Sequence, residues 1–211
     1  MNALVPWLEL AGVAVFAASG ALTASRKRLD VVGFVFVGTV TGIGGGTLRD
    51  LLLGQGAVAW IRDPVALYLT SLVSVLVYFT AHQIESRFRV LLWADAVGLA
   101  LFAVTGAKVA LAGGAPPAVA VLMGVMSATF GGLIRDVVCN ATPLILRREI
   151  YATAAAAGAV TFVALTLAGT PPVAATAVGF AVGFAIRAAA LAFGLSVPVY
   201  RPRPARNYPG R

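Results

Sequence analysis

The chain has 211 residues, of which 60% are hydrophobic and only 11% are charged, and its formal net charge is +8. Soluble domains carry roughly 25% charged residues, so this composition excludes a soluble globular protein and indicates a polytopic membrane protein. The basic residues lie mostly between apolar runs and near the C-terminus. The net charge therefore indicates membrane topology, and no nucleic-acid partner is expected.

Seven apolar runs predict an all-α integral membrane domain over residues 1–195, followed by a basic cytoplasmic tail at 196–211. Each run is about 20 residues long, which is enough to cross a hydrocarbon core of about 30 Å as a helix. In chain order, the predicted spans are residues 4–23, 31–53, 64–83, 90–111, 117–139, 150–168 and 173–195.

Lysine and arginine are concentrated in the loops on one side of the predicted bundle. The loops on the N-terminal side hold only Arg62. The opposite side holds Arg26, Lys27, Arg28, Arg87, Arg89, Arg147, Arg148, Arg201, Arg203, Arg206 and Arg211. Cytoplasmic loops carry the excess of Lys and Arg, so we expect an external N-terminus and a cytoplasmic C-terminus, which seven spans allow.

An internal repeat emerges when the chain is shifted by 86 residues, which places residues 9–78 on residues 95–164 without a gap. Each copy holds three spans, over about 4–84 and about 90–168. Because three is odd, the second copy enters the membrane from the opposite side, so we predict an inverted 3+3 repeat plus one extra helix at about 173–195. The most informative matches are Gly12/Gly98, Phe16/Phe102, Gly20/Gly106, Gly38/Gly124, Gly45/Gly131, Gly46/Gly132, Arg49/Arg135, Asp50/Asp136 and Arg62/Arg148.

Glycine clusters occupy equivalent places in the second and fifth spans, in "GIGGGTLRD" (42–50) and "ATFGGLIRD" (128–136). A glycine costs about 1 kcal/mol of helix propensity relative to alanine, so both spans are predicted to kink or to unwind briefly. Carbonyls freed there suit a partly dehydrated cation, whereas close helix packing is the alternative role. The candidate pore and kink residues are Gly42, Gly44, Gly45, Gly46, Gly131, Gly132, Thr41, Thr47, Ser127 and Thr129.

The duplicated Arg-Asp pairs need partners, because unpaired charge is expensive in a membrane. Arg49 lies 18 residues into its span, about 27 Å along the helix, so it falls near the outer face at the depth of Glu9. The same count places Arg135 near the inner face with Asp95. We therefore predict Glu9–Arg49 and Asp95–Arg135 ion pairs, the alternative being that each charge reaches its own interface separately.

Asp50 and Asp136 are not expected to bind the arginine beside them, because consecutive helical side chains point about 100° apart. Both are also candidate gate or pore charges. They are otherwise left to cap backbone near the glycines or to bind other basic groups. Lys108 and Arg187 are the candidates, and neither has a basic counterpart in the repeat. Each is either an ion-pair partner of Asp50 or Asp136 or a gating charge in a pore.

Neither an enzyme nor a metal protein is expected. The chain has a single histidine, His82, and a single cysteine, Cys139, and these two cannot build a metal site. No nucleophile–base pair is evident, and no cofactor is predicted.

The duplicated glycine and Arg-Asp motifs, within spans arranged three plus three plus one, resemble the trimeric intracellular cation (TRIC) channel family over residues 4 to about 195. The resemblance implies a homotrimer with one pore per subunit for K⁺ and, less selectively, Na⁺. It places the pore where Gly44–Gly46 meets Gly131–Gly132, with Lys108 as the basic residue near it. The short chain favours a prokaryotic plasma (inner) membrane, where bound lipid is a further expected partner.

Two departures modify this expectation. Phe130 replaces the glycine that the first copy has at Gly44, so the two kinks should be unequal, and Phe130 is a candidate hydrophobic gate. Acidic residues are scarce, so no acidic ring is expected and any selectivity should be modest and derived from backbone oxygens.

The sequence also allows two other functions. Half-helix termini beside a midplane cavity suit a carboxylate as well as a cation, so a carrier of a small zwitterion such as an amino acid is the main alternative. A scaffold or lipid-binding role is the third. Saturable uptake would indicate the carrier, and single-channel current would indicate the channel.

Overall fold

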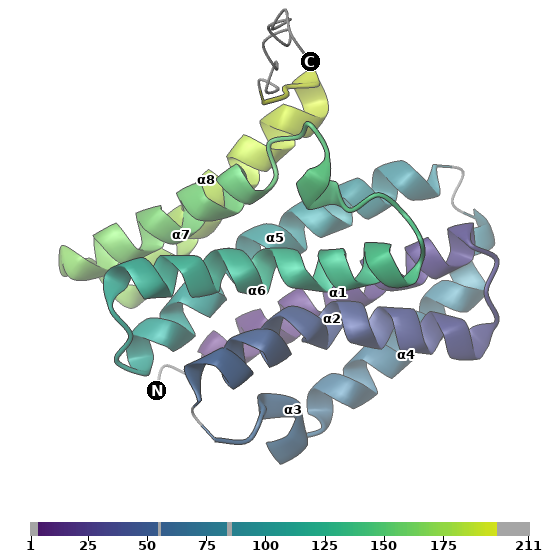
Figure 1. Cartoon of the computed structure of the whole chain (residues 1–211), viewed down its shortest axis with the longest axis horizontal. Helices are drawn as coiled ribbons and strands as arrows, with labels where there is room; N and C mark the ends of the chain where they lie inside the picture. Colours follow the sequence, from purple (N-terminus) through teal and green to yellow (C-terminus); the bar gives the residue numbers. More distant parts are fainter. Residues whose placement is uncertain (1–3, 55, 84–85, 198–211) are drawn as a thin grey trace, which may run out of the picture.

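The computed structural model describes residues 4–54, 56–83 and 86–197 (Figure 1). The predicted tail lies mostly outside these residues. Within them all regular secondary structure is helical, with no strand. The long helices are α1 (Leu4–Arg26), α2 (Val31–Leu53), α4 (Val65–Thr80), α5 (Arg87–Ala112), α6 (Pro117–Val138), α7 (Ala152–Leu167) and α8 (Pro172–Phe193). Short helical turns are α3 (Ala59–Arg62), η1 (Ala81–Gln83) and η2 (Leu144–Leu146).

Six helical segments in the described part of the chain are long and apolar enough to cross a membrane. They match the predicted spans except the sixth, because α7 has only 16 residues. At 1.5 Å per residue that is about 24 Å, less than a hydrocarbon core of about 30 Å. The reason is that residues 144–151 form a turn of 3-10 helix and irregular backbone, where the sequence predicts a loop ending at Glu149.

Helix ends follow from local sequence. The Asp30 carboxylate accepts a 2.8 Å hydrogen bond from the Gly33 amide and so caps α2. Gly54 (φ 61°) and Gly194 (φ 65°) adopt the left-handed conformation that ends α2 and α8. Pro117 and Pro172 begin α6 and α8, where a missing backbone N–H is harmless.

The core forms where the two predicted copies meet, around α1, α2, α5 and α6. α1 packs against α2 and α5, α5 packs against α6, and α2 packs against α6. At the centre the buried rings of Phe16 and Phe102 stack with centroids 5.2 Å apart. α7 and α8 pack together and against α5, on the other side of it from α2 (Figure 1).

Contacts at the centre are reciprocal between positions 86 residues apart. A Cβ added to Gly12 would lie 3.0 Å from the Phe102 ring, and one added to Gly98 would run into the Phe16 ring. These glycines make room for the opposite copy's phenylalanine. Each predicted copy thus supplies both the large and the small partner of the central contact.

The glycine clusters do not interrupt their helices. α2 stays helical through Gly42–Gly46 and α6 stays helical through Gly131 and Gly132, so the prediction of an unwound segment is wrong. A Cβ on Gly45 would meet the Ser127 carbonyl oxygen, and one on Gly131 would meet the Thr41 carbonyl oxygen. Close approach of two regular helices outweighs the glycine propensity penalty here.

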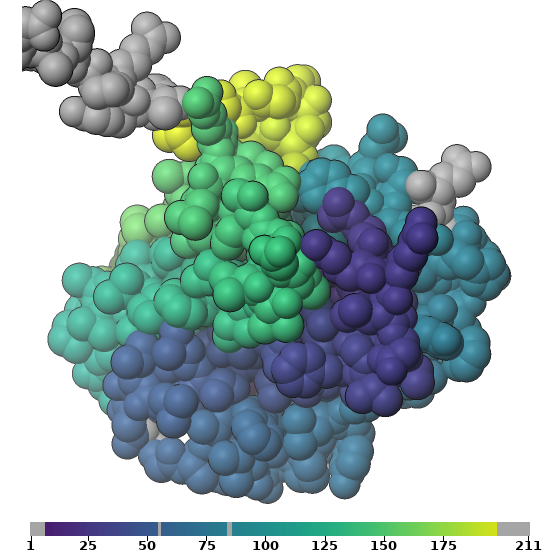
Figure 2. Space-filling view, turned by 45° about the vertical axis from the view of Figure 1, so that its right-hand side comes forward, coloured from purple at the N-terminus to yellow at the C-terminus, as the bar shows by residue number. Residues whose placement is uncertain are grey.

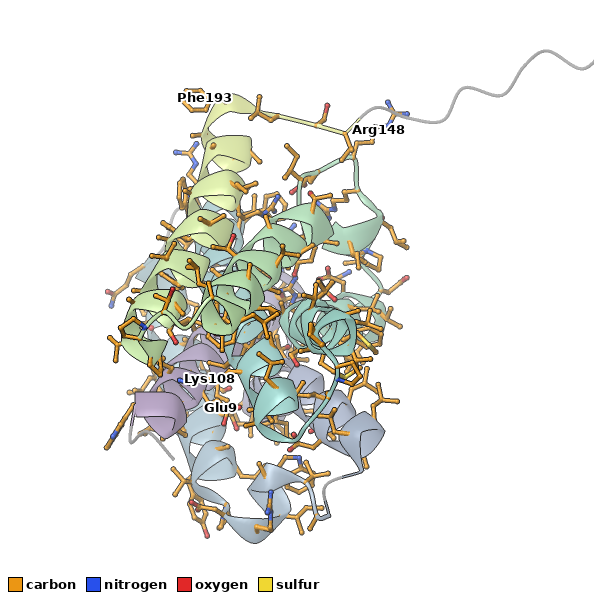
Figure 3. The ribbon with its side chains drawn as sticks, turned by 90° about the vertical axis from the view of Figure 1, so that its left-hand side faces the viewer. Glu9, Lys108, Arg148 and Phe193 are labelled. Atoms are coloured by element: carbon orange, nitrogen blue, oxygen red, sulfur yellow. The ribbon has the colours of Figure 1, made fainter. Side chains whose placement is uncertain are left out.

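The two ends of the molecule differ in charge. Figure 3 places Glu9 and Lys108 toward one end and Arg148 and Phe193 toward the other. We call these the Glu9 end and the Arg148 end. At the Arg148 end, Lys27 donates a 3.2 Å hydrogen bond to the Asn140 carbonyl, and the guanidinium groups of Arg26 and Arg147 lie over the Phe88 ring. In Figure 2 the green segment that follows α6 lies between the purple end of α1 and the yellow α8.

Candidate functional site

A cavity of about 180 Å³ opens at the Glu9 end, between α1, α2, α3 and the start of α4. Its wall combines small, aromatic and charged side chains. They include Glu9, Val13, Gly42, Gly46, Thr47, Arg49, Asp50, Trp60, Asp63 and Phe102. Phe102, from the central stack, is among these residues, so the cavity reaches the crossing of the two copies.

Arg49 is the electrostatic centre of this cavity. Its Nη1 donates to Glu9 Oε1 at 2.7 Å, which is the first predicted ion pair. Its Nε and Nη2 both donate to Asp50 Oδ1, at 2.9 and 2.7 Å. The Arg49 side chain is buried, whereas that of Glu9 is 27% exposed. One guanidinium thus links α1 to α2 beside the open space.

The far wall of the cavity is held by side chains that bond to α2. Asp50 Oδ2 accepts a 3.0 Å hydrogen bond from the Ala59 amide at the start of α3. Trp60 Nε1 donates to Thr47 Oγ1 at 2.9 Å. Asp50 therefore caps the start of α3 and not backbone near the glycines as predicted, and α3 is fixed over the mouth.

A second charge cluster lies at the Arg148 end, at the positions equivalent to the first. Arg135 Nη1 donates to Asp95 Oδ1 at 2.8 Å, which is the second predicted ion pair, and both side chains are fully buried. The same Nη1 contacts Ser19 Oγ on α1. Asp136 Oδ2 accepts from the Leu144 amide at 3.0 Å, just as Asp50 does from Ala59.

The prediction that neighbouring Arg and Asp side chains do not pair is wrong in both copies. Arg135 Nε donates to Asp136 Oδ1 at 2.8 Å, and Arg49 binds Asp50 in the same way. Cβ directions 100° apart hold short side chains apart, but an arginine has enough rotatable bonds to fold back on its neighbour. Each aspartate therefore accepts hydrogen bonds from the neighbouring guanidinium and from a backbone amide further along the chain.

Neither Lys108 nor Arg187 pairs with Asp50 or Asp136. Arg187, fully buried on α8, donates from Nη2 to Glu149 Oε2 at 2.7 Å and from Nη1 to the Ile150 carbonyl at 3.1 Å. Its guanidinium also lies 5.1 Å from the centre of the Tyr151 ring. Lys108 is half-buried and makes no ion pair within the described residues. A gating role for Lys108 stays a prediction.

The candidate hydroxyl groups mostly bond to their own helices. Thr41, Thr47 and Thr129 donate to carbonyl oxygens four residues earlier, at 2.6, 2.8 and 2.9 Å. Ser127 is buried, and its Oγ has no hydrogen-bond partner among the described residues. Phe130 is half-buried on α6, and its role as a gate stays a prediction.

Several residues of the two charge clusters were not predicted from the sequence. Trp60 and Asp63 lie in a segment that the sequence treats as a loop, and Tyr151 aligns with Val65, so the repeat hides it. Glu9, Asp50 and Asp63 together bring three carboxylates to one cavity with Arg49. The expectation that the chain has no acidic ring stays a prediction, but this grouping of carboxylates at the Glu9 end was not anticipated. Asp63 aligns with Glu149 in the repeat, and this conservative match is the feature of the sequence that could have singled out Asp63.

Sequence comparisons place the chain among bacterial membrane proteins. A family model described as "Glycine transporter" matches residues 6–83 and again residues 92–167, two segments that begin 86 residues apart. The UPF0126 inner membrane protein YadS of Escherichia coli is 40% identical over 199 residues, covering 93% of this chain and 96% of that one. A UPF0126 membrane protein of Deinococcus radiodurans is 45% identical over 156 residues, 72% of each chain.

Solved structures of similar fold are cation channels by their descriptions. The TRIC trimeric intracellular cation channel orthologue from Rhodobacter sphaeroides superposes with a TM-score of 0.90 at 51% identity, over 92% of this chain and all of that one. A prokaryotic TRIC channel crystallised in 0.5 M KCl gives a TM-score of 0.87 at 30% identity, over 93% of this chain and all of that one.

Proposed function

Because the chain belongs to the TRIC cation channel family, we propose that it conducts K⁺, and less selectively Na⁺, through one pore in each subunit of a homotrimer. The family is not a family of enzymes, and its members here are multi-pass membrane proteins of bacteria. The proposed location is the bacterial inner membrane. The proposed arrangement is seven spans, in which two inverted copies of three helices are followed by one extra helix. The charge asymmetry of the loops supports an external Glu9 end and a cytoplasmic Arg148 end.

The observation that carries the proposal is the crossing of α2 and α6. Gly45 and Gly131 bring these helices so close that the carbonyls of Ser127 and Thr41 lie against them. The cavity from the Glu9 end reaches Gly42 and Gly46, on the same stretch of α2. A path that starts in this cavity passes Gly46, where no side chain fills the space beside α2, and so brings a cation up to the crossing.

The charge of the cavity also suits a cation. Three carboxylates and one guanidinium leave a formal excess of two negative charges at its wall. A cleft lined by one sign of charge raises the local concentration of the opposite ion. Cation attraction at the mouth then adds to whatever discrimination backbone oxygens supply inside.

A carrier of a small zwitterion is the second candidate, and one observation favours it. The matching family model bears the description "Glycine transporter", and a cavity of about 180 Å³ with both an arginine and carboxylates has room for an amino acid. Arg49 argues against this use, because Glu9 and Asp50 already occupy its Nε, Nη1 and Nη2.

Current measurement separates the two candidates. We expect the purified full-length protein in a planar bilayer to give single-channel currents that reverse near the K⁺ equilibrium potential in a KCl gradient, and further from zero when the less permeant Na⁺ replaces K⁺ on the dilute side. Protein-free bilayers are the control. Absence of current, together with saturable glycine uptake by liposomes that contain the protein, would establish the carrier instead.

The exposed carboxylate at the cavity mouth gives a sharper test of the pathway. Asp63→Asn keeps the 3.1 Å hydrogen bond that Oδ1 accepts from the Val65 amide but removes one charge. We expect K⁺ conductance to fall roughly twofold at 10 mM salt, where the Debye length is about 30 Å, and not to change at 1 M, where it is about 3 Å. An equal loss at both salt concentrations would mean that Asp63 acts on structure and not on ion supply.

A further inference from the structure

The two ends of the proposed pathway carry equivalent residues in opposite states. At the Glu9 end, a Cβ added to Gly46 would find only Arg49 Nη2, 4.0 Å away, because this face of α2 borders the cavity. At the Arg148 end, the space above the equivalent Gly132 is filled. A Cβ there would lie 3.0 Å from Tyr151 Oη, 3.4 Å from Asp95 Oδ1 and 3.5 Å from Arg135 Nη2.

Tyr151 is what fills that space. It aligns with Val65, which borders the open cavity of the first copy. The Tyr151 side chain is 2% exposed, and its ring is held from behind by the guanidinium of Arg187 at 5.1 Å. Arg187 is in turn anchored by Glu149, two residues before the tyrosine. A large ring thus closes one end at the position where a small aliphatic side chain leaves the other end open.

The closed end is also short of hydrogen bonds. Tyr151 Oη, Asp95 Oδ2 and Arg135 Nη2 are buried, and none has a partner within the residues that the structure describes. Tyr151 Oη and Arg135 Nη2 both lie next to Gly132. The Asp95 atom nearest to Gly132 is Oδ1, the oxygen that Arg135 binds. Buried polar atoms without partners are costly, and water that entered this space would satisfy all three. The phenol, the carboxylate and the guanidinium are therefore the polar groups that water would reach if this end opened.

We propose that Tyr151 is the gate at the Arg148 end. The inference rests on the proposed function for the existence of a pathway, and it names the residue that controls one end of it. With the phenol seated on Gly132, water and ions are kept from Asp95 and Arg135. When the ring swings away, this end acquires the cavity that the Glu9 end already has, and the pathway becomes continuous along the crossing of α2 and α6.

Thiol accessibility tests the gate without requiring any current. The background is Cys139→Ser, which removes the only native cysteine. The probe position is Thr129→Cys, because Thr129 is 2% exposed and is equivalent to Ile43, which lines the open cavity. The reagent is a water-soluble cationic methanethiosulfonate, applied to the purified protein in detergent so that both ends are reached.

We expect Thr129→Cys to react at least tenfold more slowly than Ile43→Cys when Tyr151 is present. Tyr151→Val, which installs the residue of the open copy, should raise the Thr129→Cys rate at least tenfold and leave the Ile43→Cys rate within twofold. Tyr151→Phe keeps the ring and should leave the Thr129→Cys rate within threefold. No acceleration by valine, or equal acceleration by valine and phenylalanine, overturns the proposal.

The reverse substitution, at Val65, tests the proposal even if the Tyr151→Val variant does not fold. Val65→Tyr places a ring at the open end and should slow Ile43→Cys labelling at least tenfold, whereas an unchanged rate contradicts a gating role for this position. Bilayer recordings separate the two proposals. Faster labelling with an increased open probability in Tyr151→Val supports both, and faster labelling in a protein that carries no current keeps the gate and refutes the channel.

Discussion

Arg135→Met should be the most destabilising single charge removal in the protein. The change leaves Asp95, whose side chain is fully buried, and Asp136, whose side chain is 8% exposed, without their guanidinium. Breaking a buried ion pair by removing one partner costs about 3–5 kcal/mol. At about 2–4 °C per kcal/mol for a chain of this size, the unfolding midpoint in detergent should fall by roughly 10 °C.

The repeat supplies the matched control for that measurement. Arg49→Met removes the equivalent arginine, but it leaves Glu9, which is 27% exposed, and Asp50 beside a cavity that admits water. We expect a midpoint loss less than half as large. Adding Asp95→Leu and Asp136→Asn to Arg135→Met should recover part of the loss, since a neutral buried site avoids the unpaired charge. Equal losses for the two arginines would show that burial does not set the difference.

Gly45→Ala should disrupt the crossing of α2 and α6, although alanine favours helix. The new methyl group would overlap the Ser127 carbonyl oxygen, a backbone atom that cannot turn aside. Overpacking typically costs 1–3 kcal/mol or more, well above the gain of about 1 kcal/mol in helix propensity. We expect a lower unfolding midpoint, and under the proposed function at least a tenfold loss of K⁺ current per molecule.

Gly46→Ala, one residue further along α2, isolates the steric effect. It receives the same propensity gain, but its Cβ would meet nothing closer than Arg49 Nη2 at 4.0 Å. Its unfolding midpoint should equal or exceed that of the unmodified protein. If Gly45→Ala and Gly46→Ala behave alike, close approach at Gly45 is not what the glycine provides.

The ion pairs could be predicted because depth and repetition restrict them together. Glu9 and Asp95 are equivalent positions, and the length of each helix leaves one arginine at the matching depth. The contact of Arg49 with Asp50 could not be predicted from Cβ directions, because the flexible arginine side chain decides it. The partner of Arg187 could not be predicted from the sequence for a different reason. It is Glu149, in the irregular segment before α7, whose backbone path no periodicity describes.

The glycine clusters show the limit of propensity reasoning. Propensity describes an isolated helix, and it predicts that α2 unwinds at Gly44–Gly46. In the protein α2 is continuous there, since a neighbouring helix repays the penalty by packing closely. The kink of α2 and α6 stays a prediction. Which glycine faces a backbone carbonyl and which faces open space depends on helix rotation, and the sequence does not specify that rotation.

The reciprocal contacts of Phe16 with Gly98 and of Phe102 with Gly12 have a consequence for the origin of the chain. Neither half has a complete centre, because the ring and the notch that receives it come from different copies. Under the proposed inverted repeat, a half-length ancestor would have needed a second molecule in the opposite orientation, as dual-topology dimers do. Fusion of two such halves would let them diverge, which accounts for a tyrosine at one end and a valine at the equivalent position of the other.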